Sequence, residues 1–460
     1  MKTLLGVCIL VLVLSLGFPS GKADGQTPKR ASAPSAKGSG PARSGVAGLT
    51  WERNFQDGVA SSIRAVLVLR DGSIVVANDG EEKNPEPEKH ADGSITVVPG
   101  KTHMMVRRLD RNGNQLWVKD LVAPPMRLRG GPNRLYSLAE TRDGDLVVAG
   151  FYTRESATSG SPGSRFPKYV MEEIGYLARL APDGKLLWQK DLTTPFPDNG
   201  AAFLQETGHE REYGALHAVV ALPDGIAAAG LGYQEGFVHS FLCVRLRNDG
   251  TVISKSMGDQ SQSGEDRLTR ALALPDGSFV AAYATPGTKQ GEYFRATMVR
   301  FDPDGRQVWR QSWPVEGHHV ELTSLAVDAK GDYFLAGIAH LPQDQPWDSW
   351  LARIAPDGRI VWSQLISEDG WTLQIHALCA LRSGDIAAVG VGGLSGSSAG
   401  LVMRIAADGN ILWKRKNIGS GRNYAVAEAP DGQLIVGGEA HTPKSSGSTA
   451  WVFKIAPGGR

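Results

Sequence analysis

Residues 268–285, LTRALALPDGSFVAAYAT, and residues 296–309, ATMVRFDPDGRQVW, decide the fold of this chain. Each stretch consists of two apolar segments of strand length joined by an Asp-Gly pair, which is the pattern of a β-hairpin with a tight turn. The second hairpin carries Arg300 before its turn and Trp309 after it. Two consecutive hairpins give four short antiparallel strands, the composition of one β-propeller blade.

The unit recurs along the chain, and its recurrence sets the architecture. The first turns carry Gly72, Gly144, Gly225, Gly277, Gly331, Gly384 and Gly432, and the second turns carry Gly113, Gly184, Gly250, Gly305, Gly358, Gly409 and Gly459. We therefore predict an all-β fold, a seven-bladed β-propeller with four antiparallel strands per blade. Glycine supplies positive φ in such turns, so we assign the adjacent carboxylates to turn geometry and not to calcium sites.

The last repeat ends at Arg460, directly after its second turn and without a fourth strand. Residues 48–55, GLTWERNF, match the fourth-strand pattern of residues 186–192, LLWQKDL, yet they precede the first repeat. We expect this N-terminal strand to complete the last blade and close the ring, which would leave no unpaired sheet edge.

Two residue types recur at fixed positions. The fourth strands carry Trp51, Trp117, Trp188, Trp309, Trp362 and Trp413, with Ser254 in the remaining blade, and the third strands carry Arg108, Arg179, Arg245, Arg300, Arg353, Arg404 and Lys454. A hairpin makes the two positions neighbours, so we predict a cation over each indole, worth about 0.5–1 kcal/mol. Because the basic ring is repeated identically in each blade, we interpret it as structural.

The third and fourth strands also resemble those of known proteins. Residues 177–192, LARLAPDGKLLWQKDL, and residues 351–366, LARIAPDGRIVWSQLI, resemble the tryptophan-docking repeat of quinoprotein-like propellers, and the unit is similar to repeats of secreted bacterial β-propellers. The resemblance spans residues 48–460 and implies the fold alone. Quinoprotein repeats carry Thr-Gly where this chain has Asp-Gly, and they form eight blades, so no quinone and no catalytic residue is transferred. We expect no cofactor.

The N-terminal segments differ from the repeats in composition. Residues 1–23 combine Lys2, an apolar run from Leu4 to Phe18 and small residues before Ala23, which predicts a signal peptide. Residues 24–47 are rich in Ser, Gly, Ala, Pro and basic residues and contain no aromatic residue, which predicts a disordered linker. The expected organisation is a signal peptide, a linker and a propeller over residues 48–460, in a secreted or periplasmic protein.

Charge and cysteine content exclude several classes. Lys and Arg total 49 against 48 Asp and Glu, so the chain lacks the basic excess of nucleic-acid-binding proteins. No apolar run reaches the roughly 20 residues of a membrane span. Cys243 and Cys379 fall in blades three and six, too far apart for a disulfide, and we expect two free thiols.

The connections are longest in blades one to three, on the face opposite the tight turns. This long-loop sector comprises residues 78–103, 122–133, 152–174 and 193–213. It combines basic and apolar residues, as protein interfaces do. The candidate partner-binding residues are Met126, Arg127, Leu128, Arg129, Arg154, Phe196, Phe203 and Leu204. We interpret the protein as a non-catalytic binding module, a scaffold or an inhibitor, for another protein; loop variation without a ligand is the alternative.

A second candidate site lies where the innermost strands meet the central channel. Matching positions of the seven innermost strands carry Arg64, Tyr136, His217, Thr269, Thr323, His376 and Tyr424. This ring changes chemistry from blade to blade, as expected for a site that orients a small ligand. A hydrolase or lyase acting on sugars or lactones at this channel mouth is therefore the alternative function, and simple hydration of the channel is the competing interpretation.

The remaining candidates are weaker. Glu316, His318, His319 and Glu321 form the densest metal-capable cluster, but adjacent histidines rarely face one ion, and we assign no metal site. Trp313, Trp347 and Trp371 suit stacking on sugar rings, as in a lectin. No nucleophile motif and no phosphate-binding loop accompanies them.

Overall fold

The computed structural model describes residues 48–82, 88–89, 95–96, 102–121, 133–158, 168–192, 214–234, 238–257, 267–274, 276–285, 287, 293–315, 317–340, 347–368, 371–393, 399–416, 421–441, 447–456 and 458. For residues 88–89, 95–96, 154–158, 168–173, 214, 231–234, 238–241, 256–257, 267–269 and 340 it describes the backbone alone. These residues belong to one compact unit, Pro41–Arg460.

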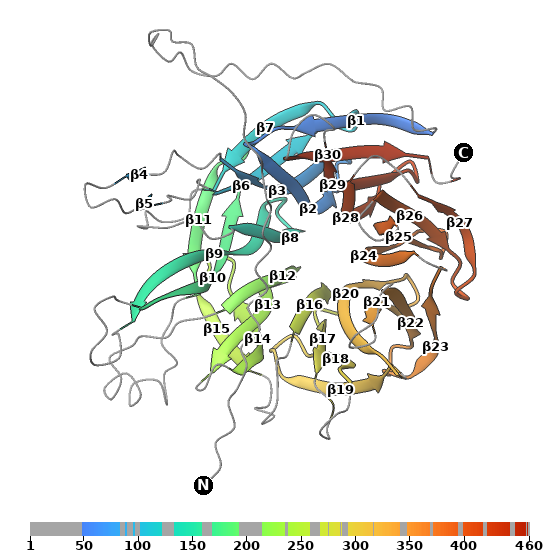
Figure 1. Cartoon of the computed structure of the whole chain (residues 1–460). Helices are drawn as coiled ribbons and strands as arrows, with labels where there is room; N and C mark the ends of the chain where they lie inside the picture. Colours follow the sequence, from blue (N-terminus) through green and yellow to red (C-terminus); the bar gives the residue numbers. More distant parts are fainter. Residues whose placement is uncertain are drawn as a thin grey trace. The chain divides into compact units, whose positions relative to one another are not determined.

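Seven four-stranded antiparallel sheets form a ring of blades (Figure 1), which confirms the predicted fold. From the axis outward, blades one to three contain β2 (Ala60–Val68), β3 (Ile74–Glu81), β6 (Thr102–Leu109) and β7 (Gln115–Asp120); β8 (Arg134–Glu140), β9 (Leu146–Thr158), β10 (Lys168–Leu180) and β11 (Leu186–Asp191); and β12 (Gly214–Leu222), β13 (Gly225–Gln234), β14 (Val238–Leu246) and β15 (Val252–Met257).

Blades four to six contain β16 (Arg267–Ala273), β17 (Phe279–Thr285), β18 (Arg295–Phe301) and β19 (Gln307–Pro314); β20 (His319–Val327), β21 (Tyr333–His340), β22 (Asp348–Ile354) and β23 (Ile360–Ile366); and β24 (Thr372–Ala380), β25 (Ile386–Gly393), β26 (Ala399–Ile405) and β27 (Ile411–Arg415). Blade seven contains β28 (Gly421–Glu428), β29 (Leu434–His441), β30 (Ser448–Ile455) and β1 (Leu49–Phe55). A two-stranded sheet of β4 (Glu88–Lys89) and β5 (Ile95–Thr96) lies in the blade-one insertion.

The first and last parts of the propeller close the ring together. Strand β1 pairs antiparallel with β30, from Leu49 opposite Ile455 to Phe55 opposite Ala450. Trp51 and Phe55 pack against the apolar cluster between blades seven and one. The N-terminal strand thus completes the last blade, as its Trp pattern predicted.

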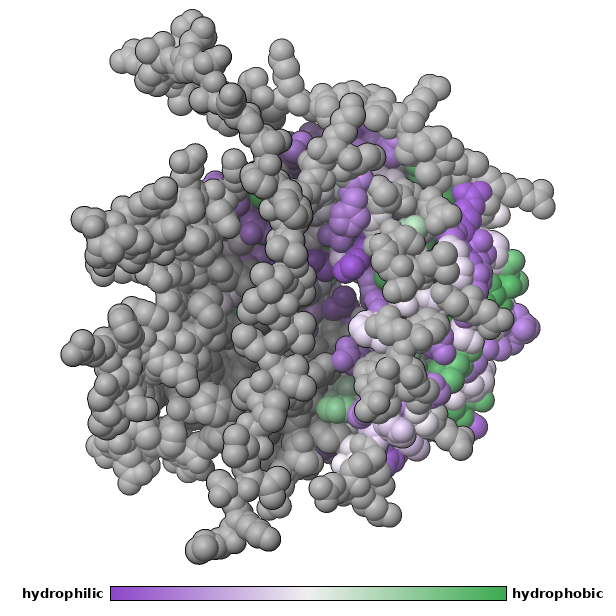
Figure 2. Space-filling view, viewed as in Figure 1, coloured by the Kyte–Doolittle hydropathy of each residue, from purple (hydrophilic) through white to green (hydrophobic). Residues whose placement is uncertain are grey.

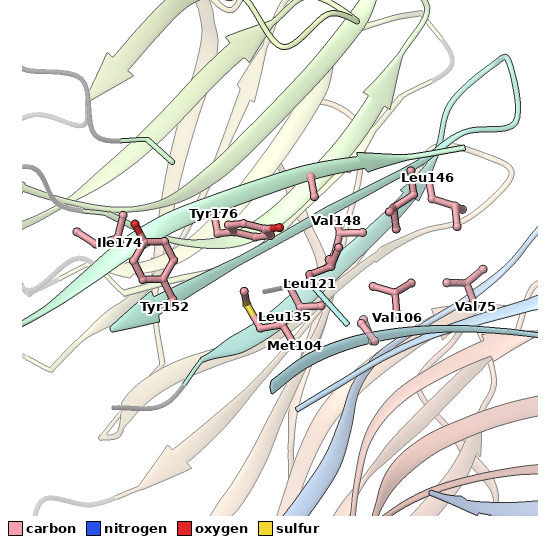
Figure 3. Packing of buried hydrophobic residues seen from close by; sticks show 14 of the residues in the cluster. Val75, Met104, Val106, Leu121, Leu135, Leu146, Val148, Tyr152, Ile174 and Tyr176 are labelled. Carbon is pink, nitrogen blue, oxygen red and sulfur yellow. The ribbon is translucent and has the colours of Figure 1, made fainter. Parts of the chain in front are cut away.

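The apolar core is divided among the blade interfaces. Each cluster of buried residues draws on two neighbouring blades; the cluster between blades one and two, for example, joins Val75 and Val106 to Val148 and Tyr176 (Figure 3). Successive residues of a strand face opposite sides of its sheet, and here both sides meet another blade. This is why the strands read as nearly continuous apolar runs.

The turns follow the prediction with one exception. Among the described turn glycines, all but Gly225 have φ between 77° and 95°. Gly225 instead opens β13, paired with Leu222 across a two-residue turn. The sequence explains the difference, because the turn of blade three is one residue shorter. The core residue Ile226 directly follows Gly225, whereas in blade four Ser278 lies between Gly277 and the core residue Phe279.

The basic ladder makes ion pairs where we predicted stacking on tryptophan. The register does place Arg108 opposite Trp117, but the guanidinium binds Asp71 of the first turn at 2.6 Å. The matching ion pairs in the other blades are Arg179–Asp145, Arg245–Asp224, Arg300–Asp276, Arg353–Asp332, Arg404–Asp385 and Lys454–Asp431. First-turn carboxylates are thus counter-ions within each blade.

The tryptophans dock onto the next blade. Trp117 Nε1 donates a hydrogen bond to the Pro182 carbonyl, 3.0 Å away in the second turn of blade two. A Cβ added to Gly184 of that turn would lie 2.9 Å from the Trp117 ring. Glycine is therefore required here both for the close approach of the ring and for the positive φ of 86°. The same contact joins Trp51 to Gly113 and Trp362 to Gly409.

We expected two buried free thiols: both cysteines are free, and Cys243 on β14 is buried, but Cys379 on β24 is only partly buried. Within the described residues, no helix has the length and apolar character required to span a membrane.

Candidate functional site

Every innermost strand contains a β-bulge, a point at which one residue is left out of the pairing with the second strand. In β2 the register shifts between Ile63 and Ala65, which leaves out Arg64. The residues left out in the other blades are Tyr136, His217, Thr269, Thr323, His376 and Tyr424. The seven residues singled out in the sequence therefore share one structural position.

The bulge explains why these side chains reach the axis. Ile63 is buried between blades seven and one, whereas Ala65 is buried between blades one and two. Arg64 lies between them and belongs to neither cluster. A regular strand directs side chains alternately to its two faces; the bulge interrupts that alternation and turns one residue toward the free inner edge.

On one side of the axis, bulge residues of blades one, seven and six form a column. The Arg64 guanidinium lies 4.0 Å from the centre of the Tyr424 ring. The Tyr424 ring stacks on His376, with centroids 5.2 Å apart and planes at 12°. Figure 2 shows hydrophilic residues bordering the hollow at the centre of the ring. The column sets a cation and two flat ring systems one on another at the bulge positions.

Carboxylates on the second strands support the column. Asp79 of β3 lies 3.5 Å from Arg64 Nε and accepts hydrogen bonds from the backbone and hydroxyl of Ser62, at 2.8 and 2.6 Å. Glu439 of β29 accepts a hydrogen bond from the Tyr424 hydroxyl at 3.0 Å. These contacts fix the orientation of Arg64 and Tyr424.

The bulge residues of blades two and three form a second aromatic pair. Tyr136 meets His217 edge to face, with centroids 5.1 Å apart, and stacks on Phe151 of its own blade at 5.8 Å. Arg134 donates a hydrogen bond to the Tyr136 hydroxyl at 3.4 Å. In contrast, Thr323 in blade five donates to the Ile375 carbonyl at 2.6 Å, so its hydroxyl joins two blades. Thr269 occupies its bulge, and its side chain is outside the description.

Arg270 is a further charged residue at the axis. Burial lowers its pKa, the Tyr136 hydroxyl opposes that effect, and the charge of Arg64 adds to it. Arg270 belongs to blade four, whereas Tyr136 and Arg64 belong to blades two and one. The pKa of Arg270 thus responds to groups from two other blades.

The pKa of His376 reflects its burial and the positive charges around it. Burial lowers its pKa to about 4, the Asn423 carbonyl opposes this, and Arg422, Arg64 and Arg270 lower it further. His376 Nδ1 lies 3.0 Å from the Asn423 carbonyl oxygen, so Nδ1 carries the proton in the neutral ring and Nε2 is an acceptor. The described site thus combines aromatic rings, guanidinium groups beside carboxylates and a histidine that is neutral at neutral pH.

The long-loop sector is described only in part. Met126, Arg127, Leu128, Arg129, Phe196, Phe203 and Leu204 lie outside the described residues. Arg154 lies on β9 opposite Glu172 of β10. We treated residues 152–174 as a loop, but β9 and β10 remain paired out to Thr158 and Lys168. Much of the blade-two insertion is therefore a long β-ribbon.

The histidine cluster between blades four and five is part of an aromatic contact. His319 Nδ1 accepts a hydrogen bond from the Phe294 backbone N–H at 3.2 Å, and its ring meets Tyr293 edge to face at 4.9 Å. Among the described residues, no group of three metal-ligating side chains is present. Glu316 lies outside the described residues.

Sequence reasoning identified the bulge residues but not the charges around them. Arg270 follows the bulge residue, at a position that holds Ala or Ser in the other six blades. Asp79 and Glu439 interrupt apolar second strands. A comparison of the seven repeats for residues that break the pattern would have found all three.

No family model matches the sequence, and no curated protein matches it. Among solved structures, a polysaccharide lyase described as a PL25 ulvan lyase bound to -[GlcA(1-4)Rha3S]- is 10% identical, with a TM-score of 0.50 over 87% of this chain and 95% of that chain. A streptogramin B lyase is 12% identical, with a TM-score of 0.45 over 88% and 97%. YCF48 bound to a D1 peptide is 12% identical, with a TM-score of 0.43 over 88% and 97%. At these identities the likeness is one of fold, and the chain is a β-propeller.

Proposed function

We propose that this propeller binds an acidic saccharide at its axis. The observation that carries the proposal is the column of bulge residues, in which the Arg64 guanidinium lies 4.0 Å from the centre of the Tyr424 ring and that ring stacks on His376; the positive charges of Arg64, Arg270 and Arg422 lower the pKa of His376. Like charges gathered in a partly desolvated cavity repel one another, and an anionic ligand relieves that repulsion. Guanidinium groups also bind carboxylates through paired, charge-assisted hydrogen bonds.

The charge around the cavity supports an anionic ligand. Arg64, Arg134, Arg270 and Arg422 occupy first-strand positions at or beside the bulges, with Asp79, Glu321 and Glu439 as the nearby carboxylates. Arg422 lies 4.0 Å from Glu439, and the Tyr424 hydroxyl donates a hydrogen bond to the same carboxylate. One carboxylate therefore interacts with both Arg422 and Tyr424. Across these residues, positive groups outnumber negative ones.

The aromatic surfaces favour a ligand with a ring. Tyr424 and His376 form a stacked pair, and Tyr136 and His217 form an edge-to-face pair. Arg64 and His376 already pack on the Tyr424 ring, so we expect a pyranose, with its apolar C–H groups and polar rim, to contact the ring edges and the hydrogen-bonding groups beside them. The ulvan lyase of similar fold was solved with a uronate-containing saccharide, so uronates are the first class to test.

Calorimetric titration with glucuronate and with glucose tests the proposal. We expect the wild type to bind glucuronate more tightly than glucose, and Tyr424→Ala to weaken both. Equal affinity of the wild type and Tyr424→Ala for glucuronate would contradict an axial site. Ultraviolet absorbance of the protein mixed with uronate oligosaccharides tests catalysis, because elimination creates an unsaturated uronate that absorbs. Formation of this product would assign the alternative function, a lyase, to the same site.

A second candidate function is protein binding through blades one to three. The observation that favours it is the ribbon of β9 and β10, which stays paired for thirteen residues, whereas the second and third strands of the other blades have seven to ten. A projecting β-ribbon offers backbone and side-chain groups to a partner, and rigid scaffolds commonly carry binding elements in this way.

Shortening the ribbon tests this second function. Joining Thr153 to Glu173, which face each other across the ribbon, through an Asn-Gly turn removes its outer part and keeps the register. A combined Arg127→Ala, Leu128→Ala and Phe203→Ala variant tests the neighbouring loops. We expect both variants to lose a partner that co-purifies with the wild type while they keep its melting temperature. Retention of that partner by both would contradict docking at this sector.

Export remains part of the proposal, because an extracellular or periplasmic protein would meet polysaccharides directly. Expression of the full chain with N-terminal sequencing of the mature protein tests it. We expect cleavage after Ala23 and recovery outside the cytoplasm. An intact N-terminus on cytoplasmic protein would contradict it.

A further inference from the structure

Two blades share a short motif on their innermost strands. Blade two carries Arg134-Leu135-Tyr136 and blade seven carries Arg422-Asn423-Tyr424, so in each an arginine lies two residues before the tyrosine at the bulge. Blade one packs between these two blades and carries Arg64 at its bulge. Three consecutive blades therefore have an arginine at the inner edge of the ring. Two residues before the bulge, the other blades carry Ser62, Ala215, Arg267, Glu321 and Gln374.

In both blades the arginine of this motif is associated with the hydroxyl of its tyrosine. Arg134 Nη1 donates a hydrogen bond of 3.4 Å to the Tyr136 hydroxyl. Arg422 Nε lies 4.0 Å from Glu439, which accepts the hydrogen bond of the Tyr424 hydroxyl at 3.0 Å. Each first strand runs from a connection between blades to the first turn. The two arginines therefore lie nearer to the face of the long connections than the bulge residues do.

The arginines at the axis differ from those of the outer ladder in their hydrogen bonds. Arg108 of the ladder donates three hydrogen bonds, at distances between 2.6 and 2.9 Å. Arg64 lies 3.5 Å from Asp79, and among the described residues its buried Nε has no hydrogen-bond partner. The separations from Asp79 and, for Arg422, from Glu439 balance charge but exceed the length of a charge-assisted hydrogen bond. Within the described part of the chain, Arg64 and Arg422 thus retain N–H donors for a ligand with anionic oxygens.

The three arginines belong to two levels along the axis. Arg64 is at the level of the bulges, whereas Arg134 and Arg422 lie two residues earlier on β8 and β28, a step of about 7 Å along a strand. Blades two and seven flank blade one, so these two arginines stand on either side of Arg64. A ligand with one carboxylate occupies one level, whereas a chain of uronates carries a carboxylate on each residue and spans both.

We propose that Arg64 binds one carboxylate and that Arg134 and Arg422 bind carboxylates of neighbouring residues in the same chain, so that the axial ligand is an oligouronate and not a single sugar. This inference rests on the proposed axial function and extends it to the length of the ligand. A guanidinium group binds a carboxylate through two parallel hydrogen bonds. Once the first carboxylate is bound, contact with the next is intramolecular and adds affinity.

Calorimetric titration with galacturonate and trigalacturonate, which differ in length, tests the inference. We expect the wild type to bind trigalacturonate roughly tenfold to a hundredfold more tightly, the range for one further hydrogen bond to a charged group. Three equivalent residues by themselves raise the affinity only about threefold, because any of them can occupy a single site. Maltotriose, a neutral trisaccharide, should therefore bind no more than about threefold more tightly than glucose.

Two variants remove the arginines of the outer level one at a time. Arg134→Gln and Arg422→Gln each lose the charge and keep an N–H donor. We expect each to reduce trigalacturonate affinity about tenfold and to change galacturonate affinity by no more than about twofold. Melting temperatures verify folding, and if one variant does not fold, the other still tests the inference. Arg306→Gln, which removes an exposed arginine from the second turn of blade four, is the matched control and should change neither affinity.

The outcomes separate this inference from the axial function. If galacturonate binds the wild type and trigalacturonate binds no more than about threefold more tightly, the axial function stands and the inference on length falls. The inference also falls if Arg134→Gln and Arg422→Gln both keep the full advantage of trigalacturonate, or if Arg306→Gln loses as much of it as they do. If neither uronate binds the wild type, both proposals fall.

Discussion

The axial bulges and the outer tryptophans are both repeated features of the blade, yet they differ in chemistry. At the outer position six blades carry tryptophan. Trp51, Trp117 and Trp362 each contact a glycine in the second turn of the following blade. At the bulge the side chain changes from arginine to tyrosine, histidine or threonine. Uniformity marks a contact that the fold needs at each interface, whereas variation on the same scaffold marks positions open to ligand recognition.

The largest expected effect comes from removing the outer contact at the point of ring closure. Deleting residues 48–55 removes β1, including Trp51 and Phe55, which pack on the cluster between blades seven and one. Loss of a fully buried tryptophan costs about 3–5 kcal/mol; Trp51 is only partly buried, but the deletion also removes Phe55 and the pairing with β30, so we expect a total loss of at least this order. Deleting residues 24–47 is the matched control, and we expect it to leave the melting temperature unchanged. Equal melting temperatures for the two truncations would contradict closure by β1.

Much of this outer architecture was predictable, because it repeats. Turn glycines, tryptophans and apolar strands recur in the sequence, and seven weak signals reinforce one another. The partners of the basic ladder were not predictable in the same way. Asp71 and Trp117 both lie within reach of Arg108, and the balance between an ion pair and stacking depends on side-chain geometry that spacing does not reveal.

The axial site was predictable only in part, for a related physical reason. The positions of Arg64 and His376 follow from strand alignment, but no sequence rule specified a bulge there. Arg270 escaped notice because a lone arginine next to an apolar strand usually indicates a solvated edge. Its pKa is affected by Arg64 and by the Tyr136 hydroxyl, and these residues are distant from it in sequence.

A pH titration of stability sharpens the comparison at the axis. Because the folded pKa of His376 is lowered from 6.5 to about 4, the unfolded chain binds a proton in this window that the folded protein does not. The stabilising contribution is complete above about pH 6.5 and is lost as pH falls toward 4. At about 1.4 kcal/mol per pKa unit, the loss is on the order of 2–3 kcal/mol.

Melting temperatures at pH 7 and pH 4.5 measure this effect. We expect His376→Gln to lose less stability on acidification than the wild type does. His441→Gln, which removes an exposed histidine from β29, is the control. A drop in His376→Gln as large as that of the wild type would show that His376 does not sense the axial charge.

A pair of glycine substitutions tests the outer contact on a smaller scale. Gly184 and Gly384 have nearly equal φ of 86° and 88°, but a Cβ at Gly184 would meet Trp117, whereas a Cβ at Gly384 would meet nothing within 4 Å. Both alanine variants carry the φ penalty of about 1–2 kcal/mol. We expect Gly184→Ala to cost roughly 1 kcal/mol more. Equal chemical denaturation midpoints would mean that the tryptophan contact does not constrain the turn.

The most direct test of the axial assignment is a crystal structure of the wild-type protein with glucuronate bound. The assignment predicts the carboxylate at the centre of the ring, within hydrogen-bond distance of the Arg64 guanidinium group, and the sugar ring beside Tyr424. Glucuronate bound at the outer strands or the long-loop sector, with the axis free of it, would contradict the account.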